Sequence, residues 1–183
     1  MPGDRDLIQI LDAALAESVR KSGEWLVCRV GCTECCIGPF PINQLDARRL
    51  REGLAELEQT DAARAARILR RSREAVARGD QGDEDACPVL DPETGACDLY
   101  APRPVTCRTF GPPVRWGAEP LGICELNFHG ATDEEIAACE VALDVRELEA
   151  GLLDGLERAA GVAGETSVAL ALLNIPDRSL AST

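Results

Sequence analysis

The stretch Cys28-Arg-Val-Gly-Cys32-Thr-Glu-Cys35-Cys36 places four cysteines within nine residues. Four further cysteines follow in the middle of the chain, namely Cys87, Cys97, Cys107 and Cys124. Thiolate sulfur is a soft ligand that suits zinc and iron–sulfur centres, and four thiolates complete either a tetrahedral zinc site or one cubane cluster. The two groups of cysteines therefore predict metal binding.

Disulfide bonds are a less favoured use of these cysteines. At 183 residues the chain is long enough to bury an apolar core without them, and its total of nine cysteines is odd. The N-terminal Met-Pro-Gly-Asp-Arg-Asp lacks the features of a secretory signal, and no apolar stretch approaches the length of a membrane span. We therefore expect a soluble, cytoplasmic protein without a membrane partner, in a compartment where structural disulfides are rare.

The acidic composition narrows the choice of partners. The formal net charge is -13, with 32 acidic residues against 19 lysines and arginines. Nucleic-acid binding draws on clustered basic side chains, so we expect no nucleic-acid partner. Thiolates would make the metal-free chain more negative still. A bound cation would relieve this repulsion and couple metal binding to folding.

The spacing of the cysteines leaves the metal open. Adjacent residues usually point their side chains apart, so Cys35 and Cys36 are expected to serve different centres, or one of them is a thiol that lies beside the ligands without binding the metal. Nine residues separate Cys87 from Cys97, and nine separate Cys97 from Cys107. This matches neither zinc-finger nor ferredoxin spacing. The choice between one polynuclear centre and two separate centres stays open at this point.

Helical patterns flank the cysteine-rich part of the chain. Apolar residues recur at spacings of three and four, and Asp4, Asn43 and Thr132 are expected N-caps. The predicted helices cover residues 4–22, 43–57, 60–79, 132–141 and 144–161. The apolar run 168–175 is too short to assign to helix or strand. The third helix carries many arginines, which we interpret as a solvated face balanced by acidic neighbours.

The middle of the chain is predicted to be irregular. Residues 24–42 and 111–122 are rich in glycine and proline and are expected to form loops. Two short apolar runs around Asp91-Pro-Glu-Thr-Gly95 suggest a hairpin that brings Cys87 and Cys97 together. Pro104 can begin a short helix near Cys107. The expected fold is mainly α, a single domain over residues 1–183 with a cysteine-rich core at about 25–130.

The cysteines and the residues around them resemble a known family. The chain reads Cys28-x3-Cys32-x2-Cys35-Cys36, then Cys87-Pro-Val-Leu, then Cys97-x2-Tyr100-x2-Arg103-Pro104-x2-Cys107-Arg108-x-Phe110, and finally Cys124. Over about residues 25–130 this is similar to the YkgJ-like cysteine-cluster family, whose members are described as zinc- or iron-chelating. A related cysteine segment in flagellin lysine methylases is thought to hold an iron–sulfur cluster.

The resemblance implies a set of site residues. All eight motif cysteines are expected metal ligands: Cys28, Cys32, Cys35, Cys36, Cys87, Cys97, Cys107 and Cys124. Arg103 and Arg108 match the motif and are expected at the cofactor, where guanidinium groups would hydrogen-bond to sulfur or hold an anion. Ion pairs with carboxylates are the alternative role for both arginines. Cys139 lies outside the set and is expected to be a small buried hydrophobe.

Two functions follow from these expectations. The first is a protein that holds an iron or iron–sulfur centre through eight cysteines and acts in redox chemistry or electron transfer. The alternative is a structural zinc protein that serves as a protein-interaction module. The chain has no phosphate loop, dinucleotide fingerprint or nucleophile elbow, so any catalysis would run through the metal. The partner, a protein or a small molecule, and any enzymatic activity stay open.

Overall fold

A computed structural model of the chain describes residues 3–29, 31–38, 41–79, 85–116, 119–120, 122–143 and 145–175. Helices dominate these ranges and the strands are short, which confirms the mainly helical fold. The backbone groups into two compact units. The first unit comprises Met1–Arg29 and Val105–Gly155, and the second comprises Val30–Pro104 and Leu156–Thr183. The single domain over residues 1–183 stays a prediction.

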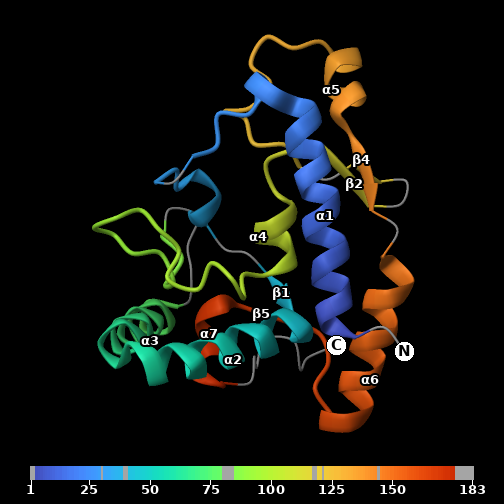
Figure 1. Cartoon of the computed structure of the whole chain (residues 1–183). Coiled ribbons are helices and arrows are strands. Elements are labelled where there is room, and N and C mark those ends of the chain that lie inside the picture. Colours follow the sequence, from blue (N-terminus) through green and yellow to red (C-terminus); the bar gives the residue numbers. More distant parts are fainter. Residues whose placement is uncertain are drawn as a thin grey trace. The chain divides into compact units, whose positions relative to one another are not determined.

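The first unit is built around helix α1 (Asp4–Ser22), which Figure 1 shows in blue. Leu7, Leu11 and Leu15 lie one turn apart and are buried, so the spacing that predicts the helix also supplies its packing face. Gly3, rather than Asp4, occupies the N-cap position, and its N–H donates to the Asp6 carboxylate. The helix bounds of the sequence analysis are confirmed, and its cap is wrong by one residue.

A small sheet in the first unit replaces a predicted loop. Strand β2 (Val114–Trp116) pairs antiparallel with β3 (Glu119–Pro120) and parallel with β4 (Val141–Leu143). The Thr132 capping box opens helix α5 (Asp133–Cys139) as expected. The helix does not continue to Val141, because the N–H of Val141 donates to the Pro113 carbonyl and begins β4. This partner lies far away in the sequence, where helical periodicity carries no information about it.

Two further helices contain first-unit residues. The short α4 (Val105–Thr109) begins directly after Pro104 and carries Cys107, close to the prediction. Helix α6 (Arg146–Ala160) confirms the helix expected over residues 144–161, although Asp144 lies outside the described residues.

The second unit packs three helices around an apolar core. They are α2 (Gln44–Thr60), α3 (Ala62–Ala77) and α7 (Val168–Leu173), which lie against one another in Figure 1. The side chain of Asn43 accepts from the N–H groups of Leu45 and Asp46, so the predicted cap is confirmed. Strands β1 (Ile42–Asn43) and β5 (Glu165–Thr166) pair antiparallel next to this core. The run 168–175, left open by the sequence, is therefore mainly helix.

The cysteine-bearing segments of the second unit rest on this core. Val89 and Leu99 are buried in the cluster formed by α2, α3 and α7, and Cys87 and Cys97 pack against it. The segment that precedes α2 contains a 3₁₀ turn, η2 (Glu34–Cys36). A second 3₁₀ turn, η1 (Gly23–Trp25), follows α1 in the first unit. Within the described part of the chain, no helix has the length and apolar character needed to cross a membrane.

Candidate metal centre

Two chain segments that are distant in sequence bring Cys36 and Cys87 together in the second unit. Ile37 and Ala86 form an isolated antiparallel bridge, and the N–H of Cys87 donates to the carbonyl of Cys36 at 2.7 Å. The N–H of Gly38 donates to the Asp85 carbonyl at 2.9 Å on the other side of the bridge. Residues that face each other across an antiparallel pair carry their side chains on the same side. Cys36 and Cys87 are therefore placed as neighbours by backbone pairing.

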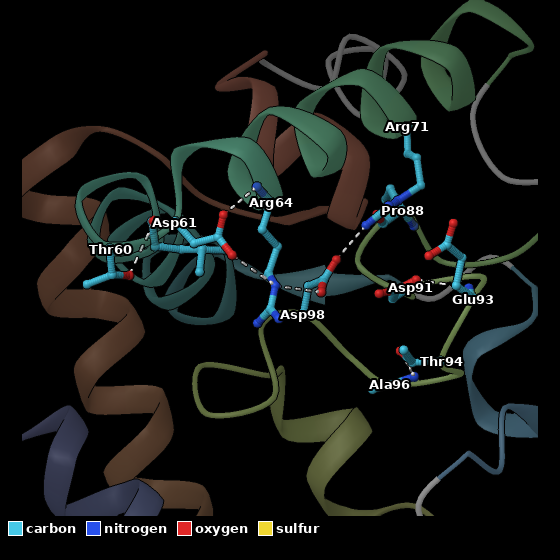
Figure 2. Close-up of polar contacts among 11 residues, drawn as sticks. Thr60, Asp61, Arg64, Arg71, Pro88, Asp91, Glu93, Thr94, Ala96 and Asp98 are labelled. Carbon is cyan, nitrogen blue, oxygen red and sulfur yellow. Dashed lines mark hydrogen bonds and ion pairs between the residues drawn. The ribbon is translucent and has the colours of Figure 1, made fainter.

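A tight connection brings Cys97 back toward Cys87, as the sequence predicts. Leu90 and Cys97 form an antiparallel bridge, and the N–H of Asp98 donates to the Val89 carbonyl at 2.9 Å. The N–H of Asp91 donates to the Ala96 carbonyl at 2.8 Å and closes the turn. Figure 2 shows this turn, with Asp91, Glu93, Thr94 and Ala96 labelled. We call residues 87–98 the cysteine hairpin.

The loop that carries Cys32 lies against the tip of the cysteine hairpin. Gly95 has a φ of +66°, and a Cβ atom built on it would lie 3.1 Å from the Cα of Gly31. Gly31 itself has a positive φ of +88°. A side chain on Gly95 would crowd the Gly31 backbone, whereas a Cβ atom on Gly31 would make only an ordinary 3.9 Å contact with the Thr94 carbonyl oxygen. Cys32, Cys35 and Cys36 are thus connected to the cysteine hairpin at two points, the tip and the base.

The thiols of Cys35 and Cys36 are hydrogen-bonded to each other. The Cys36 thiol donates to the Cys35 sulfur and lowers the pKa of Cys35 to about 6. The same hydrogen bond, together with burial, raises the pKa of Cys36. The expectation that these adjacent side chains point apart is wrong. They lie in the 3₁₀ turn η2, where successive side chains are separated by about 120° rather than by the half-turn of an extended chain.

The thiols of Cys87 and Cys97, in the cysteine hairpin, interact electrostatically with Cys36. Burial raises the pKa of Cys87 to about 12, and the charge of Cys97 adds to this effect. Burial likewise raises the pKa of Cys97. The charges of Cys35, Cys87 and Cys97 all act on Cys36 and raise its pKa further. Four thiols from two segments therefore lie close enough to influence one another, and we call Cys35, Cys36, Cys87 and Cys97 the four-thiol group.

Arg103 lies near the four-thiol group, and its contact with a cofactor stays a prediction. Its guanidinium stacks over the Tyr100 ring at 3.9 Å from the centroid and donates to the Tyr100 carbonyl at 3.0 Å. The positive charge of Arg103 lowers the pKa of Cys35 and opposes the upward shift at Cys97. A cation in this position stabilises thiolates, which is the form that binds metal.

Arginines of α3 contact the cysteine hairpin directly. Figure 2 shows Arg64 and Arg71 reaching from α3 to Asp98, the residue after Cys97. Arg71 donates to an Asp98 carboxylate oxygen at 2.7 Å, and Arg64 lies 3.5 Å from the other oxygen. Arg71 also donates to the carbonyl of Pro88 at 2.7 Å. The acidic neighbour expected for this arginine-rich face is thus part of the candidate site.

The first unit holds Cys28 through a residue that the sequence analysis does not identify. The amide of Asn127 donates to the sulfur of Cys28 at 3.3 Å and to the carbonyl of Gly111 at 3.0 Å, and its oxygen accepts from the N–H of Val27 at 3.0 Å. Asn127 is only 5% exposed. An asparagine three residues after Cys124 resembles any loop asparagine in the sequence, so no pattern reveals this role.

Three predicted ligands, Cys28, Cys107 and Cys124, belong to the first unit. Cys28 is exposed, Cys107 is partly buried on α4 and Cys124 is buried. Arg108, also on α4, donates to the Asp12 carboxylate at 2.7 Å. It therefore makes the ion pair that was its alternative role, and contact with a cofactor stays a prediction.

Cys139 behaves as the sequence predicts. It is buried at the end of α5, and its thiol donates to the Lys21 carbonyl at 3.3 Å. The small hydrophobic role expected for Cys139 is confirmed.

The donor set fits a thiolate-bound metal by its chemistry, because the second unit gathers soft sulfur ligands in the number that zinc or a cubane cluster requires. The cysteine side chains do not surround a common point in this structure. Among the residues that the structure describes, no group of three or more histidine, cysteine, aspartate or glutamate side chains is arranged to hold a metal ion. The role of each of the eight cysteines as a ligand stays a prediction.

Comparison with known proteins identifies one family. The family model CxxCxxCC, described as "Putative zinc- or iron-chelating domain", matches residues 27–138. The chain carries this pattern with one additional residue between its first two cysteines, Cys28 and Cys32. The matched range includes all eight motif cysteines and Asn127. No curated protein and no solved structure matches the chain.

Proposed function

Because the chain belongs to the YkgJ-like, or CxxCxxCC, family of zinc- or iron-chelating domains, we propose that its eight cysteines hold an iron or iron–sulfur centre. We further propose that this centre serves redox chemistry or electron transfer. The observation that carries the proposal is the four-thiol group. Backbone pairing between segments about fifty residues apart places Cys36 beside Cys87, and the bridge between Leu90 and Cys97 returns a further soft donor toward Cys87 in the same unit.

The exposure of the cysteines favours a reactive centre over a purely structural one. Of the eight motif cysteines only Cys124 is buried, whereas Cys28 is exposed and the remaining six are partly buried. A centre held by partly exposed thiolates is accessible to an electron-transfer partner or a small molecule, and exposure also tunes the potential of an iron–sulfur cluster.

A structural zinc site is the second candidate, and it is favoured by the size of the four-thiol group. Four thiolates satisfy one tetrahedral zinc ion with no position left for a substrate. In that case the metal would connect the segment around Cys35 and Cys36 to the cysteine hairpin. The protein would then act through its surfaces.

The test is purification under anaerobic conditions, followed by elemental analysis, acid-labile sulfide determination, visible absorption and Mössbauer spectroscopy. Iron with sulfide in matching amounts supports a cluster, and iron without sulfide supports a thiolate iron centre. A colourless protein that contains only zinc would refute the iron proposal and support the structural alternative. Protein that takes up no metal after reconstitution with iron, sulfide or zinc would refute both.

Single cysteine variants connect the metal to the proposed ligands. Cys36→Ser and Cys87→Ser each remove a thiolate from the four-thiol group and should lower the metal content or change the visible spectrum. Cys139→Ser is the matched control, because Cys139 is buried outside the motif and its hydroxyl replacement can still donate to the Lys21 carbonyl. Equal metal content and spectra in all three variants would exclude the four-thiol group as the ligand set.

A further inference from the structure

A single guanidinium group contacts both ends of the cysteine hairpin. Arg71 donates through Nε to the carbonyl of Pro88, the residue after Cys87, at 2.7 Å. It donates through Nη2 to the carboxylate of Asp98, the residue after Cys97, at 2.7 Å. Figure 2 shows Arg71 extending from α3 toward both groups. The side chain therefore fixes the distance between the chain segments that carry the two cysteines.

The ion pair between Arg71 and Asp98 is largely shielded from solvent. The Asp98 side chain is 4% exposed and that of Arg71 is 16% exposed. Arg64 lies 3.5 Å from the other Asp98 oxygen, but its side chain is more exposed, so Arg71 makes the shorter and more buried of the two ion pairs. The planar guanidinium presents Nε and Nη2 in a fixed geometry, whereas a lysine ammonium has a single nitrogen on a flexible stem and does not reproduce this two-nitrogen arrangement.

The rest of the hairpin is held independently of this pair. Val89 and Leu99 are buried in the apolar core of the second unit, and the N–H of Asp98 donates to the Val89 carbonyl at 2.9 Å. The core therefore sets the position of the hairpin as a whole. Arg71 acts on the two residues next to the cysteines, where small displacements move the sulfur atoms.

We propose that Arg71 and Asp98 form a positioning pair that holds Cys87 and Cys97 as metal ligands from outside the ligand set. The inference rests on the proposed metal binding and deepens it, because neither residue belongs to the cysteine motif. Groups that orient metal ligands in this way typically contribute about 10- to 100-fold to metal affinity. Arg71 and Asp98 do not contact the metal in this proposal.

The test is anaerobic titration of the metal-free full chain with Co²⁺, which reports thiolate coordination through its charge-transfer and d–d absorption bands. We compare the wild type with Arg71→Met, Arg71→Lys and Asp98→Asn. Arg67→Met is the matched control, since Arg67 is an exposed arginine on the same helix. We expect about 10- to 100-fold weaker Co²⁺ binding for Arg71→Met and Asp98→Asn, and shifted d–d bands. Arg67→Met should behave as the wild type.

Arg71→Lys keeps the charge and separates geometry from electrostatics. Because a single ammonium nitrogen does not reproduce the two-nitrogen geometry of the guanidinium, we expect this variant also to weaken Co²⁺ binding, by less than Arg71→Met. Far-ultraviolet circular dichroism identifies the folded variants, and the lysine and asparagine substitutions provide the comparison if the methionine variant does not fold.

The outcomes separate the inference from the proposed function. If the wild type binds Co²⁺ through thiolates and the folded variants bind it with unchanged affinity and unchanged bands, the positioning role is refuted while metal binding stands. A loss of stability alone, with the same affinity and spectrum, also refutes it, because that result describes an ordinary structural ion pair. If the wild type shows no thiolate-to-cobalt bands, the proposed function fails and the inference fails with it.

Discussion

At the scale of single residues, Asn127 connects three backbone segments of the first unit. Its side chain satisfies the N–H of Val27 and the carbonyl of Gly111, and it donates to the sulfur of Cys28. Buried backbone groups that lose their partners cost about 1–3 kcal/mol each. The residue therefore contributes to the fold and also determines the surroundings of a proposed metal ligand.

We predict that Asn127→Ala lowers the free energy of unfolding by about 1–3 kcal/mol, because it leaves the buried carbonyl of Gly111 and the partly buried N–H of Val27 without this partner. Urea denaturation of the metal-free protein measures the loss. Glu125→Ala, an exposed substitution in the same turn, is the control and should change the stability by less than about 0.5 kcal/mol. Equal effects of the two substitutions would contradict the role assigned to Asn127.

Gly95 is the second residue whose role depends on close contact. Its φ of +66° disfavours any side chain, and its Cβ position lies 3.1 Å from the Cα of Gly31. We predict that Gly95→Ala destabilises the protein by about 1–3 kcal/mol more than Gly161→Ala. Gly161 is a matched control because it has the same φ of +66° and nothing within 4 Å of its Cβ position.

Thermal unfolding of both glycine variants measures this difference. If they melt at the same temperature, the backbone conformation alone would explain the cost. The approach of the Gly31 loop to the cysteine hairpin would then contribute nothing to stability.

At the scale of elements, helix α2 packs against the segment that leads from the cysteine hairpin toward Cys107. A Cβ atom on Gly53, within α2, would lie 2.3 Å from Cγ of Pro102. Glycine usually weakens a helix by about 0.5–1 kcal/mol relative to alanine. At Gly53 the absence of a side chain permits the contact between α2 and Pro102. The tertiary contact therefore requires a residue of low helix propensity.

Because of this contact, we predict that two glycine-to-alanine substitutions change the free energy of unfolding in opposite directions. Gly53→Ala should destabilise the protein by about 1–3 kcal/mol, because Pro102 or the helix must shift. Gly151→Ala, in helix α6 with nothing within 4 Å, should stabilise it by about 0.5–1 kcal/mol. Chemical denaturation of both variants provides the comparison. Stabilisation by Gly53→Ala would show that α2 and Pro102 are not in close contact.

The elements also show what kind of structure the sequence can predict. The helices that begin at Asp4, Gln44 and Asp133 follow from periodic apolar residues and caps, since helical hydrogen bonds join residues four apart. Strand β2 lies in a segment expected to be a loop, because its parallel partner β4 is about 25 residues away along the chain. Strand pairing depends on long-range contacts that a local pattern does not contain.

At the scale of the whole molecule, we expect charge and metal binding to be coupled. The chain carries a formal net charge of -13, and the thiolates of the proposed ligands would add to it. Bound metal cations offset part of this self-repulsion. A ligand that binds only the folded state at about 100 times its Kd adds about 2.7 kcal/mol of stability.

We therefore predict that removal of the metal by an anaerobic chelator lowers Tm by about 5–11 °C, at about 2–4 °C per kcal/mol for a chain of this size. Raising the salt concentration from about 0.1 M to about 1 M should recover part of this loss, because it screens the repulsion between exposed charges. Calorimetry of the metal-loaded and metal-free protein at both salt concentrations tests this. Identical Tm values for the two forms would refute the coupling.

The sequence by itself determined the helical segments, the cysteine set and the family, because each of these depends on residue type and on the spacing between residues that are close in the chain. Only the tertiary structure decided that Cys35 and Cys36 lie beside the hairpin pair Cys87 and Cys97, and that Arg71 connects Pro88 with Asp98. It also decided that Asn127 contacts Cys28. These contacts join residues far apart along the chain. Their free energy depends on how the helices and loops pack, which no short stretch of sequence encodes.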